Sequence, residues 1–215
     1  MSFGEVTVEL LNASKYTIGL FFLTLLIAIP LGMVICACSM SKFRPVKYIT
    51  SIFVWIIRGT PLMLQIIVVF YGPGLLFGTP IKNRFLAALI AFAINYGVYF
   101  SEIYRGGIQS MPNGQYEAGK VLGMNRWQIN NLIIFPQVAK KVTPAMSNEV
   151  ITLVKDTSLA NIIAIGEIIL TAKDIVAGTG IIWPLFYTGV FYLAMIGLLT
   201  IFFKWLEKKM NYYRA

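Results

Sequence analysis

The chain has 215 residues, of which 58% are hydrophobic and 13% are charged. A mean hydropathy of +0.75 excludes an ordinary soluble domain of this length, because such a domain needs a more polar surface, so the excess of apolar residues is expected to face lipid. The formal net charge of +9 does not indicate nucleic acid binding, since the basic residues lie mostly between apolar runs.

Apolar runs of the right length for membrane helices recur along the chain, each able to cross about 30 Å of hydrocarbon. Glu5 and Glu9 precede the first run in place of a basic cluster, and no small-residue cleavage site follows it, which favours a retained span over a signal peptide. Because the runs lack strand-like alternation, we expect an all-α membrane protein with one transmembrane domain over residues 1–215. The five predicted spans are residues 16–38, 48–71, 85–104, 142–170 and 182–205.

Prolines and glycines indicate where these spans are irregular. Pro30 and Gly32 in the first span, and Pro61 in the second, are expected to kink or locally unwind their helices, either for packing or as hinges. Pro73 and Gly74 are expected to mark a loop just after the second span.

The distribution of basic residues predicts the orientation. Most of the 18 Lys and Arg residues lie in the loops and tail on one side of the five spans, while Arg58 and Lys155 lie within spans. Because loops rich in Lys and Arg stay in the cytoplasm, the N-terminus is expected outside and the C-terminus inside.

Residues suited to metal binding are scarce. The chain contains no histidine, which removes the commonest metal ligand and general base. Cys36 and Cys38 lie in an apolar run and are interpreted as small buried residues, with a metal or redox pair as the alternative. We therefore expect no metal site and no catalytic residue.

The longest connection, residues 105–141, joins the third and fourth spans on the cytoplasmic side. It has a helical pattern of its own over residues 115–129 and ends at Phe135-Pro136. Structured loops of this length are often functional, although a surface helix without a partner is the alternative.

Within this loop stand Glu117-Ala118-Gly119, Gly123 and then Phe135-Pro136. The pattern resembles the EAA loop of permease subunits of binding-protein-dependent ABC importers. In that family the loop forms a coupling helix that docks on the ATPase subunit. Gly119 replaces the usual second alanine, and Phe135 the usual leucine; the glycine lowers helix propensity by roughly 1 kcal/mol, so the helix is expected to fray there.

Three further stretches resemble the polar amino acid uptake branch of the same family, the branch of histidine, glutamine and arginine permeases. They are residues 58–62, 102–108 and 155–159, and Gly114-Gln115 completes the pattern. The resemblance implies a multi-pass subunit of the bacterial cytoplasmic membrane that moves a polar amino acid inward by alternating access. The implied ATPase-coupling residues are Gln115, Glu117, Ala118, Gly119 and Gly123.

The same resemblance implies a set of partners. They are two ATP-binding cassette ATPase subunits, a second permease copy or paralogue, and an extracytoplasmic substrate-binding protein. The chain has no Gly-rich phosphate loop, so we expect it to hold no cofactor, with ATP and magnesium bound by the partner ATPase.

Charged and polar residues inside the spans form stripes. A charge at the bilayer centre costs roughly 2.5–3.5 kcal/mol on insertion scales, so each one requires a reason. Residues seven apart lie on one helix face, and the stripes are therefore expected to face one another or a watery cavity. The pairs are Arg58 and Gln65, Asn95 and Glu102, with Tyr99 between them, and Glu149 and Asp156.

Two interpretations of the stripes stay open at this point. Arg58 or Lys155 can pair with the carboxylates and hold the bundle together, or the stripes can line a substrate pocket. In the second case Glu149 or Asp156 is expected to hold an ammonium or a cationic side chain. These carboxylates slightly favour a cationic amino acid as the substrate. The candidate substrate-binding residues are Arg58, Gln65, Asn95, Tyr99, Glu102, Glu149, Asp156, Thr157 and Ser158.

Two other classes of function fit the sequence less well. A secondary transporter would use Glu102, Glu149 or Asp156 as a proton relay, but no inverted repeat is visible and the loop at 105–141 would have no role. A membrane enzyme would have only a carboxylate pair, and Glu149 and Asp156 lie about 10 Å apart along a helix, too far to share a proton.

Overall fold

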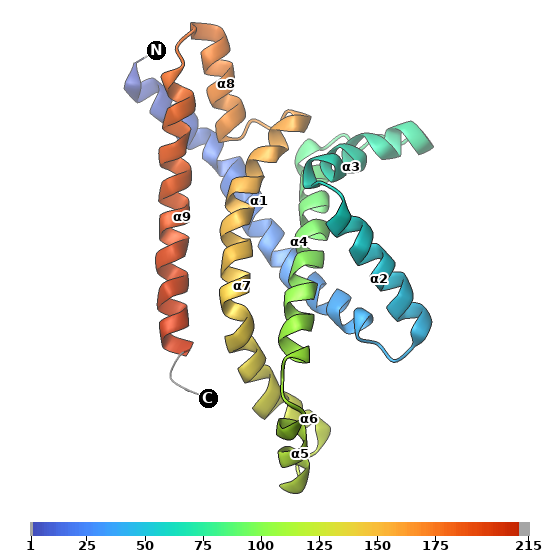
Figure 1. The fold of residues 1–215 in the computed structure, drawn as a ribbon. Helices are drawn as coiled ribbons and strands as arrows, with labels where there is room; N and C mark the ends of the chain where they lie inside the picture. Colours follow the sequence, from blue (N-terminus) through green and yellow to red (C-terminus); the bar gives the residue numbers. More distant parts are fainter. Residues whose placement is uncertain (1, 211–215) are drawn as a thin grey trace.

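The computed structural model describes residues 2–210, and over this range the regular elements are all helices. Figure 1 shows an elongated bundle in which α9 lies at one edge, α2 and α3 at the other, and α4 and α7 between them. The elements are α1 (Phe3–Ser39), α2 (Arg44–Gly59), α3 (Leu62–Phe77), α4 (Arg84–Gln109), α5 (Asn113–Val121), α6 (Arg126–Gln128), the π-helix η1 (Ile129–Ile134), α7 (Phe135–Asp156), the 3₁₀-helix η2 (Thr157–Ile163), α8 (Ile168–Thr179) and α9 (Trp183–Met210).

Three helices in the described range, α1, α4 and α9, are long and apolar enough to cross a membrane. The pair α2 and α3 adds a fourth if it is counted as one span, although the two halves meet at 108°. The prediction of an all-α membrane fold is confirmed, while the count of five spans and their orientation remain predictions. α7, the predicted fourth span, carries several charges that lower its apolarity.

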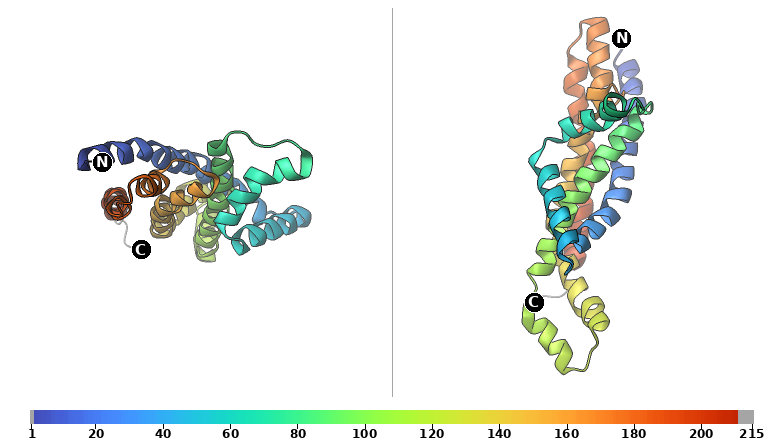
Figure 2. Two further views of the ribbon diagram at one scale, coloured as in Figure 1. Left: turned by 90° about the horizontal axis from the view of Figure 1, so that it is seen from above. Right: turned by 90° about the vertical axis from the view of Figure 1, so that its right-hand side faces the viewer.

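The first helix is longer than predicted. It begins at Phe3 instead of residue 16, because Ser2 and Glu5 form a reciprocal capping box that satisfies the first backbone N–H groups. Its 37 residues extend well beyond about 30 Å at about 1.5 Å per residue. α1 accordingly runs obliquely across the bundle, and it remains helical through Pro30 (Figures 1 and 2).

Gly32 lets α1 pack closely on α4, a helix with many buried residues. A Cβ at position 32 would lie 2.9 Å from the Cβ of Phe100 and 3.0 Å from the carbonyl oxygen of Gly97. A Cβ on Gly97 would in turn meet Leu31 at 3.0 Å. Two small residues therefore let the helix backbones approach closely, as is common in membrane bundles, and the expected local unwinding at Gly32 is wrong.

The predicted second span is an elbow of two helices. α2 ends at Gly59, Thr60 and Pro61 are extended, and α3 leaves at 108°. Pro61 cannot continue the helix because its ring removes a backbone donor and disfavours helical geometry before it. The expected loop at Pro73 and Gly74 is wrong, because both lie inside α3, which ends at Gly78 with φ of 66°.

The fourth predicted span is helical only to Asp156. The chain then tightens into η2, and Ala164 adopts a left-handed conformation with φ of 56°. Glu167, which is 1% exposed, caps α8 through the N–H groups of Ile169 and Leu170, both at 2.8 Å, and accepts a 3.2 Å hydrogen bond from Tyr192 of α9. The single helix expected over 142–170 is therefore wrong beyond residue 156.

The connection between α4 and α7 projects from the end of the bundle opposite the N-terminus (Figure 2). The helix predicted over 115–129 is divided in two. α5 ends at Val121, the chain turns at Gly123 with φ of 73°, and Asn125 caps α6 with a reciprocal bond to Gln128. A helix interior does not tolerate a left-handed residue, so the turn ends α5.

Candidate functional site

A cavity of about 530 Å³ lies between the α2–α3 elbow, α4 and the last turns of α7. Its volume is within the range of about 300–1,000 Å³ that is usual for small-molecule sites. The elbow contributes backbone next to the cavity, because Thr60 and Pro61 interrupt the helix there. The lining residues are Arg58, Gly59, Thr60, Pro61, Leu62, Asn95, Tyr96, Tyr99, Glu149, Thr152, Asp156 and Leu159.

Five of the nine candidate substrate-binding residues line this cavity: Arg58, Asn95, Tyr99, Glu149 and Asp156. They come from three separate helices, as the spacing of the stripes led us to expect. Two carboxylates and one guanidinium therefore surround a single space. An ammonium and a carboxylate group of one small molecule can both find an opposite charge there.

Tyr96 is a lining residue that the sequence analysis missed. It is 2% exposed, and its hydroxyl donates a 2.7 Å hydrogen bond to Oδ2 of Asp156. A buried tyrosine hydroxyl normally needs such a partner. The signal available in the sequence was a tyrosine hydroxyl in the middle of an apolar span, one residue after Asn95.

Gln65 supports the elbow from outside this cavity. Its Nε2 donates to the carbonyl oxygens of Ile57, at 2.8 Å, and Thr60, at 3.1 Å, which the break at Pro61 leaves without helical partners. Its Oε1 accepts a 3.0 Å hydrogen bond from Nδ2 of Asn95. Gln65 therefore fastens the elbow to α4, and it lines an apolar groove next to the cavity.

Thr157 and Ser158 also lie outside the cavity lining. The Thr157 hydroxyl is fully buried and donates to the carbonyl of Val154 at 2.6 Å, while Ser158 donates to Lys155 at 2.7 Å. Both hydroxyls are thus used at the junction of α7 and η2. Lys155 itself is exposed.

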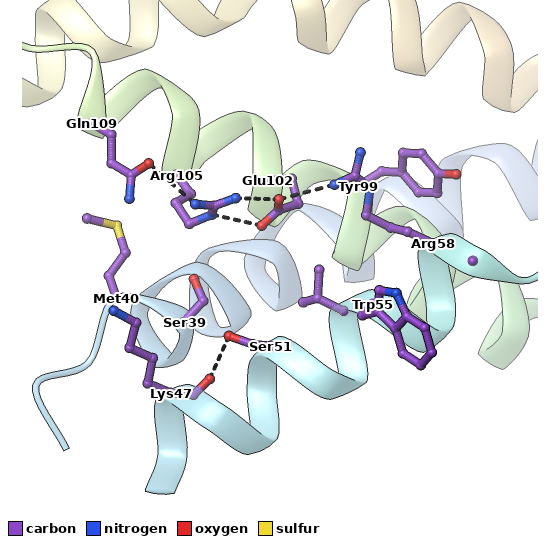
Figure 3. A pocket seen from close by; sticks show the side chains of 12 residues that line it. Ser39, Met40, Lys47, Ser51, Trp55, Arg58, Tyr99, Glu102, Arg105 and Gln109 are labelled. Atoms are coloured by element: carbon purple, nitrogen blue, oxygen red, sulfur yellow. Dashed lines mark hydrogen bonds and ion pairs between the residues drawn. The ribbon is translucent and has the colours of Figure 1, made fainter. Parts of the chain in front are cut away.

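Glu102 is engaged by two arginines. Its carboxylate accepts hydrogen bonds from Arg105 at 2.6 and 2.9 Å and from Arg58 at 3.2 Å, one of the ion pairs considered from the sequence. Arg58 also lies over the ring of Tyr99, 5.7 Å from its centroid. Glu102 lines a second cavity, of about 670 Å³, shown in Figure 3.

The candidate coupling residues lie on α5 and the turn that follows it. Glu117 and Ala118 are exposed, as are the neighbouring Val121 and Leu122, so one face of α5 is free to contact another protein. Gln115 is partly covered and accepts a 3.4 Å hydrogen bond from Gln137 of α7.

Gly119 lies on the opposite, buried face of α5. A Cβ there would be 2.7 Å from Cγ1 of Ile129, so the glycine lets α5 pack against the start of η1. The expected fraying at Gly119 is wrong, since α5 continues through it to Val121. Gly123 provides the left-handed turn described above.

No group of three or more potential metal ligands occurs among residues 2–210. Cys36 is buried and Cys38 is partly exposed, and both are free thiols; the Cys36 thiol contacts the sulfur of Met40 at 3.8 Å. Neither cysteine lines either of the two cavities.

Comparison with known families gives one match that extends over almost the whole chain. Residues 10–212 match the family described as the binding-protein-dependent transport system inner membrane component. The chain belongs to this family. Its members are membrane-embedded permease subunits of ABC importers, so the chain is a transporter subunit whose family is not itself catalytic.

Two curated relatives are permeases for amino acids. The chain is 33% identical to the arginine transport system permease protein ArtQ of Bacillus subtilis over 203 residues, which cover 94% of this chain and 92% of that protein. It is 40% identical to the L-cystine transport system permease protein TcyB of the same organism over 164 residues, or 74% of this chain and 68% of that protein. The predicted resemblance to amino acid ABC permeases is therefore confirmed.

A solved structure described as an amino acid ABC transporter with histidines matches with a TM-score of 0.87 and 31% identity, covering 95% of each chain. The inward-facing MetNI methionine ABC transporter matches with a TM-score of 0.73 at 17% identity, covering 98% of this chain and 99% of that one, and so supports the permease fold alone. ABC permeases work with ATPase subunits and with a second permease, and this permease is expected to share both.

Proposed function

We propose that this permease imports a cationic L-amino acid across the bacterial cytoplasmic membrane, and that the cavity between the elbow, α4 and α7 is its substrate site. The N-terminus faces outward and α5 lies in the cytoplasm, in agreement with the excess of basic residues in the α5 connection and the C-terminal tail. A substrate-binding protein delivers the amino acid from outside, and alternating access releases it inside.

The placement of Glu149, Asp156 and Arg58 around one cavity is the observation that carries this proposal. Glu149 and Asp156 hold the ammonium group and the cationic side chain, and Arg58, with the amide of Asn95, holds the carboxylate. The cavity has more carboxylates than cations, so a substrate with net positive charge balances it. Relatives for arginine and for other amino acids are consistent with a substrate of this class.

Partner subunits supply the energy for transport. Two ATPase subunits bind ATP and magnesium, a second permease copy or paralogue completes the pathway, and the exposed face of α5 with Glu117 and Ala118 docks on the ATPase. The exposed apolar residues Val121 and Leu122 at the end of α5 support this, because exposed apolar side chains favour contact with a protein partner.

Uptake of labelled L-arginine into proteoliposomes tests the substrate site. The liposomes contain the permease with its ATPase and binding protein, with L-glutamine as the comparison substrate. We expect uptake that requires ATP and survives a proton ionophore, and about tenfold or greater loss with Asp156→Asn, since a charge-assisted bond contributes about 1.5–3 kcal/mol.

Asp174→Asn is the matched control, because Asp174 is exposed on α8 and lies outside both cavities. Uptake at the wild-type rate in the Asp156→Asn variant would reject the site. Uptake that is abolished by the ionophore and independent of ATP would reject the coupling to an ATPase.

The docking face is tested by Glu117→Arg, with Glu207→Arg on α9 as a control charge reversal. We expect Glu117→Arg to lower co-purification of the ATPase and to reduce uptake, while Glu207→Arg has neither effect. Full assembly and full uptake in the Glu117→Arg variant would show that this face of α5 is not the contact.

A further inference from the structure

A second cavity, of about 670 Å³, lies between the end of α1, α2 and the C-terminal half of α4. Figure 3 shows Lys47 and Trp55 on α2 and Glu102, Arg105 and Gln109 on α4 around it. These residues of α4 lie nearer to α5 than Asn95 and Tyr96, which line the substrate cavity, because α4 leads into α5. The second cavity is therefore displaced from the first toward the α5 end of the permease.

The two cavities share part of their walls. Arg58, Gly59 and Tyr99 line both. The Arg58 side chain is 48% exposed, and its guanidinium is held between the Tyr99 ring and the Glu102 carboxylate. Arg58 therefore lies at the boundary between the two cavities, where a ligand in either cavity can reach it.

The two cavities carry opposite charge. Glu149 and Asp156 outnumber Arg58 in the substrate cavity, whereas Lys47, Arg58 and Arg105 outnumber Glu102 in the second. Both carboxylate oxygens of Glu102 accept hydrogen bonds from Arg58 and Arg105. Among residues 2–210 the ammonium group of Lys47 has no hydrogen-bond or ion-pair partner. The second cavity thus offers an unused cation and a net positive field, which suits a carboxylate.

We propose that the second cavity is a release site, which binds the α-carboxylate of the amino acid after it leaves the substrate cavity. This inference rests on the proposed function. Arg58 holds the carboxylate in the first cavity, and Lys47 takes it over in the second while Glu102 keeps Arg58 and Arg105 in position. The positive field attracts the carboxylate and repels a cationic side chain, so binding is weak and the substrate leaves toward the cytoplasm.

Lys47→Gln tests the release site, with Lys42→Gln as the matched control. Both lysines are exposed and lie five residues apart, but only Lys47 lines the cavity. Two quantities are measured on the complete transporter: the maximal rate of ATP-driven L-arginine uptake, and the Kd of L-arginine for the nucleotide-free complex. Because a single exposed ionic contact is worth up to about 1 kcal/mol, we expect Lys47→Gln to lower the rate about threefold to fivefold and to leave the Kd unchanged.

Lys47→Arg keeps the charge and is expected to restore most of the rate, whereas Lys47→Met keeps a stem of similar length without the charge and is expected to lose as much rate as Lys47→Gln, which a purely structural role of the lysine stem would not require. Wild-type uptake in the Lys47→Gln variant, or an equal loss in the Lys42→Gln variant, would overturn the release site and leave the proposed function intact. Failure of the wild-type transporter to take up L-arginine would instead reject the proposed function, and the release site with it.

Discussion

The hydroxyl of Tyr96 in the centre of α4 donates a 2.7 Å hydrogen bond to the carboxylate of Asp156 in the last turn of α7. This contact joins two helices at the point where both line the substrate cavity. It also fixes the direction of the Asp156 carboxylate, because the Tyr96 ring is held by a stacked contact with Phe92 and an edge-to-face contact with Phe100, with ring centroids 6.4 and 6.0 Å away. The aromatic column therefore positions an acidic group of the proposed site.

Tyr96→Phe is expected to reduce L-arginine uptake about tenfold while the complex still assembles, because a hydrogen bond to a charged group contributes about 1.5–3 kcal/mol and the ring itself is kept. Uptake into proteoliposomes is the measurement. Tyr104→Phe is the control, since Tyr104 lies on the same helix outside both cavities. Equal uptake by the two variants would show that the contact has no part in transport.

Gln65→Ala is expected to destabilise the permease by about 1–3 kcal/mol, because it leaves the Thr60 carbonyl and the Asn95 amide without their partner and removes the shorter of two hydrogen bonds to the Ile57 carbonyl. A lower thermal unfolding midpoint of the detergent-solubilised complex would confirm this. Asn12→Ala, at an exposed position of α1, is the comparison. An unchanged midpoint for Gln65→Ala would mean that the elbow is held by other contacts.

Gly119→Ala is expected to weaken coupling, although alanine favours helices, because the added methyl would overlap Ile129. Overpacking of this kind costs about 1–3 kcal/mol. The measurement is the amount of L-arginine taken up per ATP hydrolysed. Ile129→Ala in the same chain should restore part of the loss, because it removes the Cγ1 and Cδ1 atoms that the added methyl would overlap.

Gly114→Ala is the matched control for this prediction, since nothing lies within 4 Å of a Cβ at position 114. If the Gly119→Ala variant takes up as much L-arginine per ATP as the Gly114→Ala variant, then the packing of α5 on η1 does not couple ATP hydrolysis to transport.

The orientation can be measured with a membrane-impermeant maleimide on cysteine variants in which Cys36 and Cys38 are replaced by alanine. We expect Lys82→Cys to be labelled in intact cells and Lys120→Cys only after permeabilisation. Both positions are exposed. The reverse pattern would place α5 outside and remove it from any cytoplasmic ATPase.

The sequence predicted the helical membrane fold and the meeting of polar stripes well, because both follow from local patterns. Glu149 and Asp156 lie seven apart, so they share a face whatever surrounds them. The elbow at Pro61 was also indicated, since proline restricts the residue before it as well as its own backbone. Its angle of 108° depends on the packing of α3 against α4, which no local pattern contains.

Errors arose where a residue's role depends on a distant partner. Gly32 and Gly119 looked like helix breakers, but each is small because another helix or side chain approaches it. Pro73 looked like a loop, but it lies within α3. The role of Thr157 and Ser158 in substrate binding stays a prediction; both lie outside the cavity lining, and their hydroxyls bond to the preceding turn of their own chain. Such local bonds compete with ligand contacts and cannot be recognised from residue type alone.

The substrate site can be observed by cryo-electron microscopy of the nucleotide-free transporter with saturating L-arginine. We expect density for one amino acid between the elbow, α4 and α7, with its cationic groups facing Glu149 and Asp156 and its carboxylate facing Arg58. An empty cavity, or density bound elsewhere, in a preparation that carries out ATP-driven uptake of L-arginine would contradict the proposed site.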